Sequence, residues 1–357
     1  MLSILDKYII KKFLSTFFFM MAVIMVLAMV FDLSERLGDF IEKKAPISAI
    51  IFEYYLNFIM FYGNLFSALI IFISVIWFTS KMAQNSEIIP MLNSGKPFTR
   101  ILRPYMIAAT LLTIISLFLN HIILPSANKR RLDFEEKYYR IRLAVDGYYA
   151  EFPHGENVYF SYYNSDDGYI QDFYIEQWNK NNKLDYFLEA KKAKFISKGK
   201  WHLEGVFTRK LGSLNDEIHS YKSLDTTFSF GIEDFAQRDN VVETMNYTEL
   251  NNFIKREKAK GNENIPAFEI EQHQRTSYPF ASYVLTLIGV SVSSRKSRGG
   301  IGAHIAIGLA FVFLYIFAMK ITSVAAINVG FPPIIAVWLP NIMFGIVGLV
   351  LYKYAPK

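Results

Sequence analysis

Charged side chains inside or beside apolar stretches are the residues of this sequence best placed to do chemistry. Lys320 lies within an apolar run, between Met319 and Ile321. An ionisable group at this depth in a membrane helix is costly, so it usually faces a cavity or a partner, or its amine extends to the membrane surface. We therefore predict that Lys320 either lines an internal cavity or extends toward the outer surface.

Basic residues that follow two other apolar runs form a second group of candidates. Arg36, Lys43 and Lys44 follow the first run, and Arg130 and Arg131 follow the third. Arginine and lysine near a membrane surface bind phosphate groups through charge-assisted hydrogen bonds. The same residue types also serve as ordinary interfacial anchors. Both interpretations remain open for each residue.

Catalytic, metal and nucleotide motifs do not emerge from the sequence. The six histidines (His121, His154, His202, His219, His273 and His304) have no metal-ligand spacing. No glycine-rich loop ending in Lys-Ser or Lys-Thr is present, so we do not expect this chain to bind ATP as a P-loop protein does. We expect no enzyme, no metal and no cofactor here, with any ATP bound by a partner.

Six apolar stretches determine the fold class. About 20 apolar residues cross a bilayer, and we predict spans at residues 13–31, 59–78, 105–124, 277–294, 305–327 and 333–351. The predicted fold is an α-helical polytopic membrane protein with an inserted all-β, jellyroll-like domain between the third and fourth spans. We place the domains at residues 1–128, 129–272 and 273–357, with both chain ends on one side.

Charge is distributed unevenly between these parts. Residues 129–271 have 21 Lys and Arg against 25 Asp and Glu, a net charge of −4, whereas the rest of the chain carries +10. Basic residues concentrate before the first span, in the loop 80–103, at residues 295–298 and at the C-terminus. Cytoplasmic loops retain excess Lys and Arg, so we predict cytoplasmic termini and an external β domain. The basic pI reflects this topology and does not indicate nucleic-acid binding.

The polar block reads as β-structure. Apolar and aromatic residues alternate with polar ones at Trp201, Leu203, Gly205 and Phe207, and again from Leu224 to Phe230. Turn signals at 164–168, 179–183 and Gly199 separate the runs. This favours an antiparallel sandwich, jellyroll or open barrel, whose aromatic faces form either a groove or a closed core. A helix follows at 247–260, capped by Asn246 or Thr248 and ended by Gly261. The chain has no cysteine, so disulfides play no part.

Short motifs in a fixed order resemble one known family. They are Leu5-Asp6-Lys7-Tyr8-Ile9, Ser86-Glu87, Asn93-Ser94-Gly95, Leu124-Pro125, Ala190-Lys191-Lys192-Ala193, Trp201-His202-Leu203, His273 with Arg275 and Pro279, Arg298-Gly299-Gly300, Phe331-Pro332-Pro333 and Trp338-Leu339-Pro340-Asn341. Together with the layout of three spans, a domain and three spans, they resemble the lipopolysaccharide export permeases of the LptF/LptG (YjgP/YjgQ) type. The Gly330-to-Ile335 segment is more similar to the LptG branch.

The resemblance implies a permease subunit in the bacterial inner membrane, with a periplasmic β-jellyroll. Two such subunits, sister chains or two copies, would enclose a cavity, and an LptB-like cytoplasmic ATPase dimer would drive it. Lipopolysaccharide would pass to LptC-like and LptA-like proteins, one a single-span accessory and one a periplasmic bridge. We expect residues 86–92 to form a short coupling helix against the ATPase, with Glu87 paired to a basic residue, Leu92 near its end and Gly95 terminating it. Glu87 as a solvated charge is the alternative.

Apolar residues in the spans would contact the acyl chains. Phe66, Phe311 and Tyr315 are candidates, with ordinary packing or lipid contact as the alternative for each. A lysine that the LptG branch has within its first span is absent from the corresponding segment here, Leu27 to Val30. The phosphate contact of that lysine therefore does not carry over.

Two other classes of protein remain open. A membrane-anchored periplasmic sensor, or an ABC subunit that transmits force without moving lipid, would use the β domain to bind a ligand. Such a protein favours fewer spans or an attached signalling domain. An enzyme acting on lipid within the membrane would need acidic or histidine residues clustered at one depth, and the predicted spans hold few of them.

Overall fold

The structure is a computed structural model that describes residues 3–93, 97–139, 144–152, 155–164, 168–179, 183–197, 199–212, 215–231, 239–294 and 300–355. The chain forms two compact units. The helical unit comprises Met1–Tyr139, Glu243–Asn251 and Pro266–Lys357, and the β unit comprises Arg140–Val242 and Asn252–Ile265. The expected domain boundary at residues 128 and 129 falls inside a helix of the helical unit.

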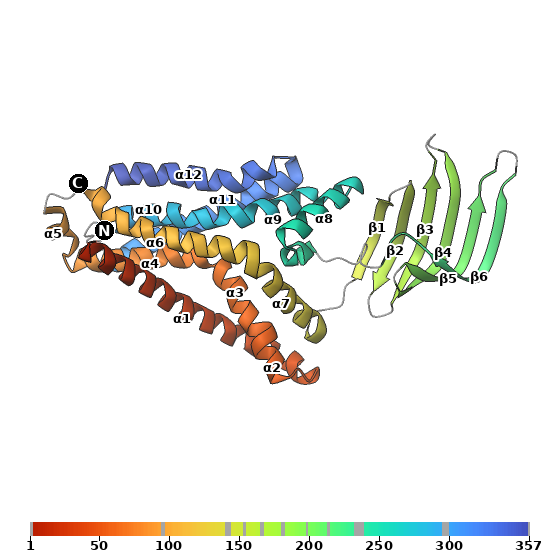
Figure 1. Ribbon diagram of the computed structural model, residues 1–357, viewed down its shortest axis with the longest axis horizontal. Coiled ribbons are helices and arrows are strands. Elements are labelled where there is room, and N and C mark those ends of the chain that lie inside the picture. The colour runs from red at the N-terminus through yellow and green to blue at the C-terminus, as the bar shows by residue number, and fades with distance from the viewer. Residues whose placement is uncertain are drawn as a thin grey trace. The chain divides into compact units, whose positions relative to one another are not determined.

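Helices account for the first and last thirds of the chain (Figure 1). They are α1 (Ile4–Glu42), α2 (Ile47–Ala49), η1 (Ile50–Tyr55), α3 (Leu56–Leu65), α4 (Ser67–Gln84), α5 (Ile88–Asn93), α6 (Phe98–Phe118), η2 (Leu119–Ile123), α7 (Leu124–Tyr138), η4 (Asp239–Thr244), α8 (Tyr247–Ala259), α9 (Ile265–Ser277), η5 (Tyr278–Phe280), α10 (Ala281–Ser293), α11 (Gly300–Val329) and α12 (Pro333–Lys353). The segments η1 and η2 are π-helical, and η4 and η5 are 3₁₀-helical.

Five helical segments among the described residues are long and apolar enough to cross a membrane. They are Ile4–Glu42, Ser67–Gln84, Phe98–Tyr138, Gly302–Val329 and Pro333–Lys353. The polytopic helical class is therefore confirmed. The expected span at 277–294 differs, because the 3₁₀ turn η5, which contains Pro279, separates α9 from the 13-residue α10. Proline cannot donate the backbone hydrogen bond that a continuous helix would need here. Helix α10 packs against α4, α6 and α12.

Both described chain ends lie at the same end of the helical unit, beside α5 (Figure 1). Ala355 packs in one core cluster with Ile9 and Phe98, and the rings of Phe98 and Tyr352 are 5.8 Å apart. This arrangement fits a chain that crosses the helical unit an even number of times.

Interruptions in three membrane helices are linked by hydrogen bonds. The chain breaks at Phe66 between α3 and α4, at η2 after α6 and at η5 before α10. The Tyr278 hydroxyl donates to the carbonyl of Leu65, and the Asn341 amide donates to the carbonyl of Ser277 at 2.9 Å. Polar side chains from neighbouring helices thus satisfy carbonyls that the breaks release, as a bilayer environment requires.

Asparagine and serine side chains extend this polar layer between α3 and α6. The Ser116 hydroxyl donates to Asn64 Oδ1 at 2.8 Å, and Asn64 Nδ2 donates to Asn120 Oδ1 at 3.1 Å. Asn120 Nδ2 returns a bond to the Ser116 carbonyl at 2.9 Å, at the point where the π-helix η2 disturbs the regular ladder. The layer joins the second and third predicted spans where both are irregular.

The β unit is a six-stranded antiparallel sheet whose strands follow one another in chain order. The strands are β1 (Ala144–Phe152), β2 (Glu156–Asn164), β3 (Tyr169–Trp178), β4 (Leu184–Ser197), β5 (Lys200–Lys210) and β6 (Glu217–Thr227). The inserted β domain is confirmed, and its described strands are connected as an up-and-down meander. Gly199 lies between β4 and β5, and the Asn179 N–H donates to the Lys183 carbonyl at 2.9 Å between β3 and β4. Residues 165–167 and 180–182 of the other two predicted turns lie outside the described residues.

A row of residues with left-handed backbone bends the sheet. Gly147, Asp172 and Gly205 have φ values of 64°, 48° and 65°, and the strand register skips each of them. Such irregularities increase local twist and shift the alternation of inward and outward side chains. In β5, Leu203 and Val206 are therefore both buried, and Phe207 turns outward. The expectation that Phe207 shares a face with Trp201 is wrong for this reason.

Aromatic side chains fill the inward face of the bent sheet. Trp201 is fully buried, stacks on Phe173 with ring centroids 5.9 Å apart, and donates its indole N–H to the Phe230 carbonyl at 3.3 Å. Phe228 and Phe230 stack on each other at 5.0 Å. The described inward positions thus form a packed aromatic cluster.

The predicted helix after the sheet is confirmed. Asn246 and Glu249 form reciprocal side-chain-to-backbone bonds of 2.9 Å at the start of α8, a capping box in which Asn246, one of the two predicted caps, is the N-cap. Gly261 follows the helix with φ of 70°, a conformation that glycine adopts without strain.

Candidate coupling and substrate sites

A short helix stands where the coupling helix is predicted. Helix α4 ends at Gln84, Ser86 has φ of 56°, and Glu87 directly precedes α5. The helix thus begins two residues later than the predicted 86–92. Leu92 lies in α5, although its side chain is not among the described ones, and Gly95 lies outside the described residues.

Glu87 accepts two hydrogen bonds from uncharged donors. Its carboxylate oxygens accept from Asn85 Nδ2 at 3.0 Å and from the Tyr8 hydroxyl at 3.4 Å. Within the described part of the chain no cation pairs with this carboxylate. Among the described residues, Glu87 is therefore a positioned carboxylate without a cationic partner.

An ion pair missed by the sequence analysis ties α1 to the start of α6. Asp6, with 1% of its surface exposed, accepts from both terminal nitrogens of Arg100, at 2.8 Å for Nη2. Arg100 Nη2 also donates to the Ser3 hydroxyl at 3.0 Å, and Ser3 and Asp6 form the capping box of α1. A bidentate arginine–carboxylate pair holds a defined geometry. Tyr8 contacts Glu87, so the N-terminal part of α1 is bonded both to the residue before α5 and to the start of α6.

The first group of basic candidates lies at the C-terminal end of α1. The Arg36 guanidinium lies 4.4 Å from the ring centroid of Tyr139 and 3.2 Å from Glu35. Its Nε is buried without a hydrogen-bond partner among the described residues. Lys43 and Lys44 are exposed where α1 ends. All three cations thus lie within a few residues, two of them without an ion pair in the described structure.

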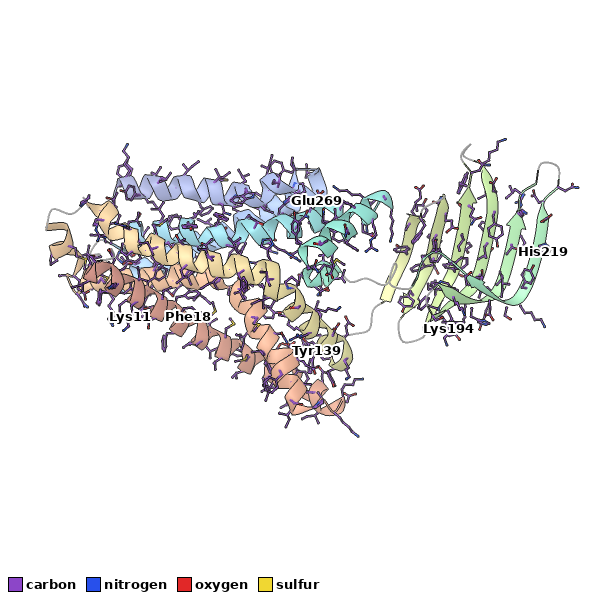
Figure 2. The ribbon with its side chains drawn as sticks, in the orientation of Figure 1. Lys11, Phe18, Tyr139, Lys194, His219 and Glu269 are labelled. Carbon is purple, nitrogen blue, oxygen red and sulfur yellow. The ribbon has the colours of Figure 1, made fainter. Side chains whose placement is uncertain are left out.

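A cluster of tyrosines holds this end of α1 against η1 and α7. Asp32 accepts from the hydroxyl of Tyr54 at 3.0 Å and from that of Tyr55 at 3.2 Å. The Tyr54 and Tyr139 hydroxyls are 3.0 Å apart, and Tyr139 is labelled in Figure 2. These hydrogen bonds and the stacked rings of Tyr54 and Phe134 hold the C-terminal part of α1, which carries Arg36, against α7.

Adjacent arginines of α7 have different surroundings. Arg130 is exposed, whereas Arg131 has 5% of its surface exposed. Arg131 donates to Asn128 Oδ1 at 3.0 Å from Nε and 2.6 Å from Nη2, and pairs with Glu135. Its guanidinium also lies 4.6 Å from the ring centroid of Phe61. This placement favours a structural role for Arg131 and leaves Arg130 accessible.

The candidates within the spans are also separated. Lys320 is exposed on the face of α11 that carries Phe313 and Phe317, with no ion pair to a described residue. Phe66 is partly exposed at the break between α3 and α4, and Phe311 is partly buried. Tyr315 is buried and donates to Asn341 Oδ1 at 2.9 Å, which favours a packing role. On α1, Phe18 belongs to a long exposed apolar face (Figure 2).

The missed residues left a weak signal in the sequence. Asp6 belongs to one of the quoted motifs, but nothing in a linear sequence pairs it with Arg100, which lies 94 residues away.

Comparison with curated proteins finds no match. Comparison with protein families matches residues 7–354 to the lipopolysaccharide export system permease LptF/LptG, a description that covers both branches. This match spans nearly the whole chain, so the protein belongs to the LptF/LptG family of lipopolysaccharide export permeases.

Proposed function

We propose that this permease component of the lipopolysaccharide export system is one half of an ABC transporter. It would extract lipopolysaccharide from the inner membrane and pass it to a periplasmic bridge protein and a single-span accessory protein. A separate cytoplasmic ATPase dimer would bind and hydrolyse the ATP, and a sister permease or a second copy of this chain would complete the cavity. The observation that carries this proposal is Glu87 directly before α5, which has no cationic partner in the described part of the chain, in a member of this family.

The same proposal assigns an orientation. The end of the helical unit that holds α5 and both chain ends would face the cytoplasm, because the basic residues of the sequence concentrate there. The β unit would then be periplasmic. Glu87 would pair with a basic residue of the ATPase. The contacts of Asp6 with Arg100 and of Tyr8 with Glu87 would then transmit movement of the coupling segment to α1.

Accessible cations at the opposite end would receive the phosphorylated headgroup. Arg36, Lys43, Lys44 and Arg130 are the candidates, and Lys320 would line the lipid cavity or extend to the surface. Phe66 and Phe311 would contact acyl chains. Arginine and lysine supply charge-assisted hydrogen bonds to phosphate, which suits a lipid whose headgroup is anionic.

Copurification with the candidate ATPase in detergent tests this proposal. We expect a stable complex whose ATP hydrolysis changes when lipopolysaccharide is added. Glu87→Arg should weaken the complex, because it reverses the charge presented at α5. Lys81→Glu, a charge reversal at an exposed position of the same segment, is the matched control and should leave association intact.

Two outcomes would contradict the proposal. A Glu87→Arg variant with wild-type association and wild-type lipid-dependent hydrolysis would exclude Glu87 from coupling. If the wild-type chain associates with no ATPase at all, a periplasmic sensor becomes the better interpretation.

A further inference from the structure

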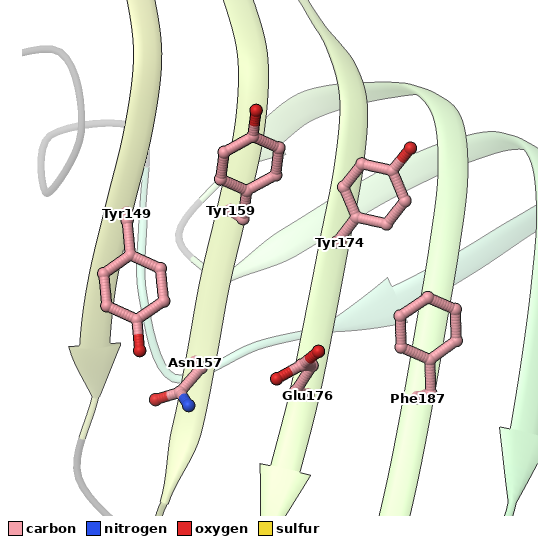
Figure 3. A pocket seen from close by; sticks show the side chains of 6 residues that line it. All are labelled: Tyr149, Asn157, Tyr159, Tyr174, Glu176 and Phe187. Atoms are coloured by element: carbon pink, nitrogen blue, oxygen red, sulfur yellow. The ribbon is translucent and has the colours of Figure 1, made fainter.

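The outward face of strands β1 to β4 carries a row of aromatic side chains (Figure 3). Tyr149, Tyr159 and Tyr174 are direct cross-strand neighbours, and Phe187 follows on β4 in the next row. Tyr149 and Tyr159 have 66% and 44% of their surface exposed. The inward face of the sheet already has its own aromatic core, so these outward rings are not needed to close the fold.

These rings border a shallow depression of about 470 Å³, lined also by Asn157 and Glu176. The ring centroids of Tyr159 and Tyr174 are 5.7 Å apart, and those of Tyr174 and Phe187 are 6.2 Å apart. A volume of this size falls within the range of small-ligand sites, which combine aromatic walls with a few polar groups.

Polar groups of the depression have unused hydrogen-bonding capacity. Asn157 Oδ1 is buried and has no partner among the described residues. Glu176 Oε2 accepts from the indole N–H of Trp178 at 2.9 Å, which orients the carboxylate and leaves its second oxygen for a ligand. A buried polar atom without a partner is costly, which points to a ligand or water that satisfies it.

The combination of these groups identifies the chemical class of ligand. A pyranose ring can place its C–H face on a tyrosine ring and direct its hydroxyls to an amide oxygen and a carboxylate. Glu176 disfavours an anionic phosphate by like-charge repulsion, and an acyl chain would leave both polar groups desolvated without partners. Tyrosine suits this use because its ring is apolar while its hydroxyl remains hydrated.

We propose that the row of Tyr149, Tyr159, Tyr174 and Phe187, with Asn157 and Glu176, is a binding site for neutral sugar rings. The inference rests on the proposed function and specifies it, because the sugars would belong to the saccharide part of the exported glycolipid. The site contacts that saccharide on the outside of the sheet, on the face opposite the packed aromatic core.

Binding of a lipid-free oligosaccharide tests this site. The probe is the core oligosaccharide released from lipopolysaccharide by mild acid and then dephosphorylated, so that it presents neutral sugar rings. It is added to the full-length protein in detergent, and binding is followed by calorimetry and saturation-transfer NMR. The double variant Tyr159→Ala, Tyr174→Ala should bind about tenfold or more weakly, because it removes two stacking rings. Tyr159→Phe should stay within about threefold of wild type, since the ring remains, and Asn157→Ala should weaken binding by about threefold to tenfold.

Tyr221→Ala is the control, because Tyr221 is a 41% exposed tyrosine on β6 that pairs with the inward Val206 and therefore lies on the face opposite the row. Circular dichroism and melting temperature establish that the variants remain folded. Equal oligosaccharide binding by wild type and the double tyrosine variant would overturn the inference. Displacement of the oligosaccharide by lipid A that lacks core sugars would overturn it too. So would a double tyrosine variant that loses binding to a purified bridge protein but binds the oligosaccharide as the wild type does.

The two proposals fail in distinguishable ways. If lipopolysaccharide changes ATP hydrolysis but the wild-type chain does not bind the oligosaccharide, only the sugar site is refuted. If the oligosaccharide binds through the tyrosine row but no ATPase associates with the chain, only the transporter function is refuted.

Discussion

Replacement of Arg131 by alanine should destabilise the helical unit, whereas the same change at Arg130 should not. Arg131 has three hydrogen bonds to Asn128 and Glu135 and lies over the ring of Phe61. Its partner Glu135 is also buried, with 4% of its surface exposed. Arg131→Ala would leave this carboxylate buried without the guanidinium that balances it.

The size of the effect follows from the burial of both partners. Removing one member of a buried ion pair costs about 3–5 kcal/mol, because the remaining charge is desolvated without compensation. Arg130 is exposed, so Arg130→Ala should change the free energy of unfolding by no more than about 0.5 kcal/mol. Replacing both Arg131 and Glu135 by methionine should recover most of the loss, since neither member of the pair would then leave the other as an unpaired buried charge.

Equilibrium unfolding in detergent measures these differences, and lipid-dependent ATP hydrolysis of the assembled complex is the second readout. We expect Arg130→Ala to weaken the response to lipopolysaccharide without changing stability, and Arg131→Ala to lower stability first. An Arg131→Ala variant with wild-type stability would refute the structural role assigned to its ion pair. A double methionine variant as unstable as Arg131→Ala would refute the physical reason given for it.

Three further predictions concern the coupling segment, the bent sheet and pH. Asp6→Asn and Arg100→Lys should each lower the lipid response of the ATPase while the complex still assembles, because the bidentate ion pair between α1 and α6 is lost but Glu87 remains. An unchanged response in both variants would exclude this ion pair from coupling. Gly205→Ala should lower the free energy of unfolding by about 1–2 kcal/mol because of its left-handed backbone, and by more because the new Cβ would lie 3.1 Å from the Lys191 side chain. Gly147→Ala measures the backbone cost alone, because Gly147 has φ of 64° and open space around it. If both variants were as stable as the wild type, the left-handed backbone would not be the source of the cost. Burial, with Glu271 nearby, raises the pKa of Glu243 above its ordinary 4.5, so the folded protein binds this proton more tightly than the unfolded chain does. Stability should therefore fall as pH rises from 4.5 through the folded pKa. Glu243→Gln should flatten this fall in melting temperature, and an unchanged pH profile would show that Glu243 is not responsible.

Local patterns predicted the parts of this structure that depend on neighbouring residues. Helix α8 was predicted from a cap at Asn246 or Thr248 and from Gly261 after its end, because a cap and a terminal glycine act within one turn. The alternation in β5 was predicted only as far as Gly205, where a left-handed residue changes which face the next side chain takes. Glycine signals that such a conformation is permitted, but the neighbouring strands determine whether it is adopted.

Candidate sites were predictable to a smaller extent. The charge of Glu87 at the start of a short helix was foreseen, and its contact with Tyr8 was not. Arg130 and Arg131 are identical in type and adjacent in sequence, yet one is exposed and the other buried, because a helix turns successive side chains by 100° and only one faces Phe61. The row of outward aromatic rings likewise becomes visible only once four strands are placed side by side.

The sequence by itself determined that this is a membrane protein of the LptF/LptG family with an inserted β domain. Apolar length sets the spans because bilayer thickness is fixed, and ordered motifs identify the family. Only the tertiary structure decided that a 3₁₀ turn interrupts the fourth predicted span, that Asp6 pairs with Arg100 and that the sheet bends at one row. Each of these depends on residues far apart in the chain whose burial and hydrogen bonding are settled together, when the elements pack.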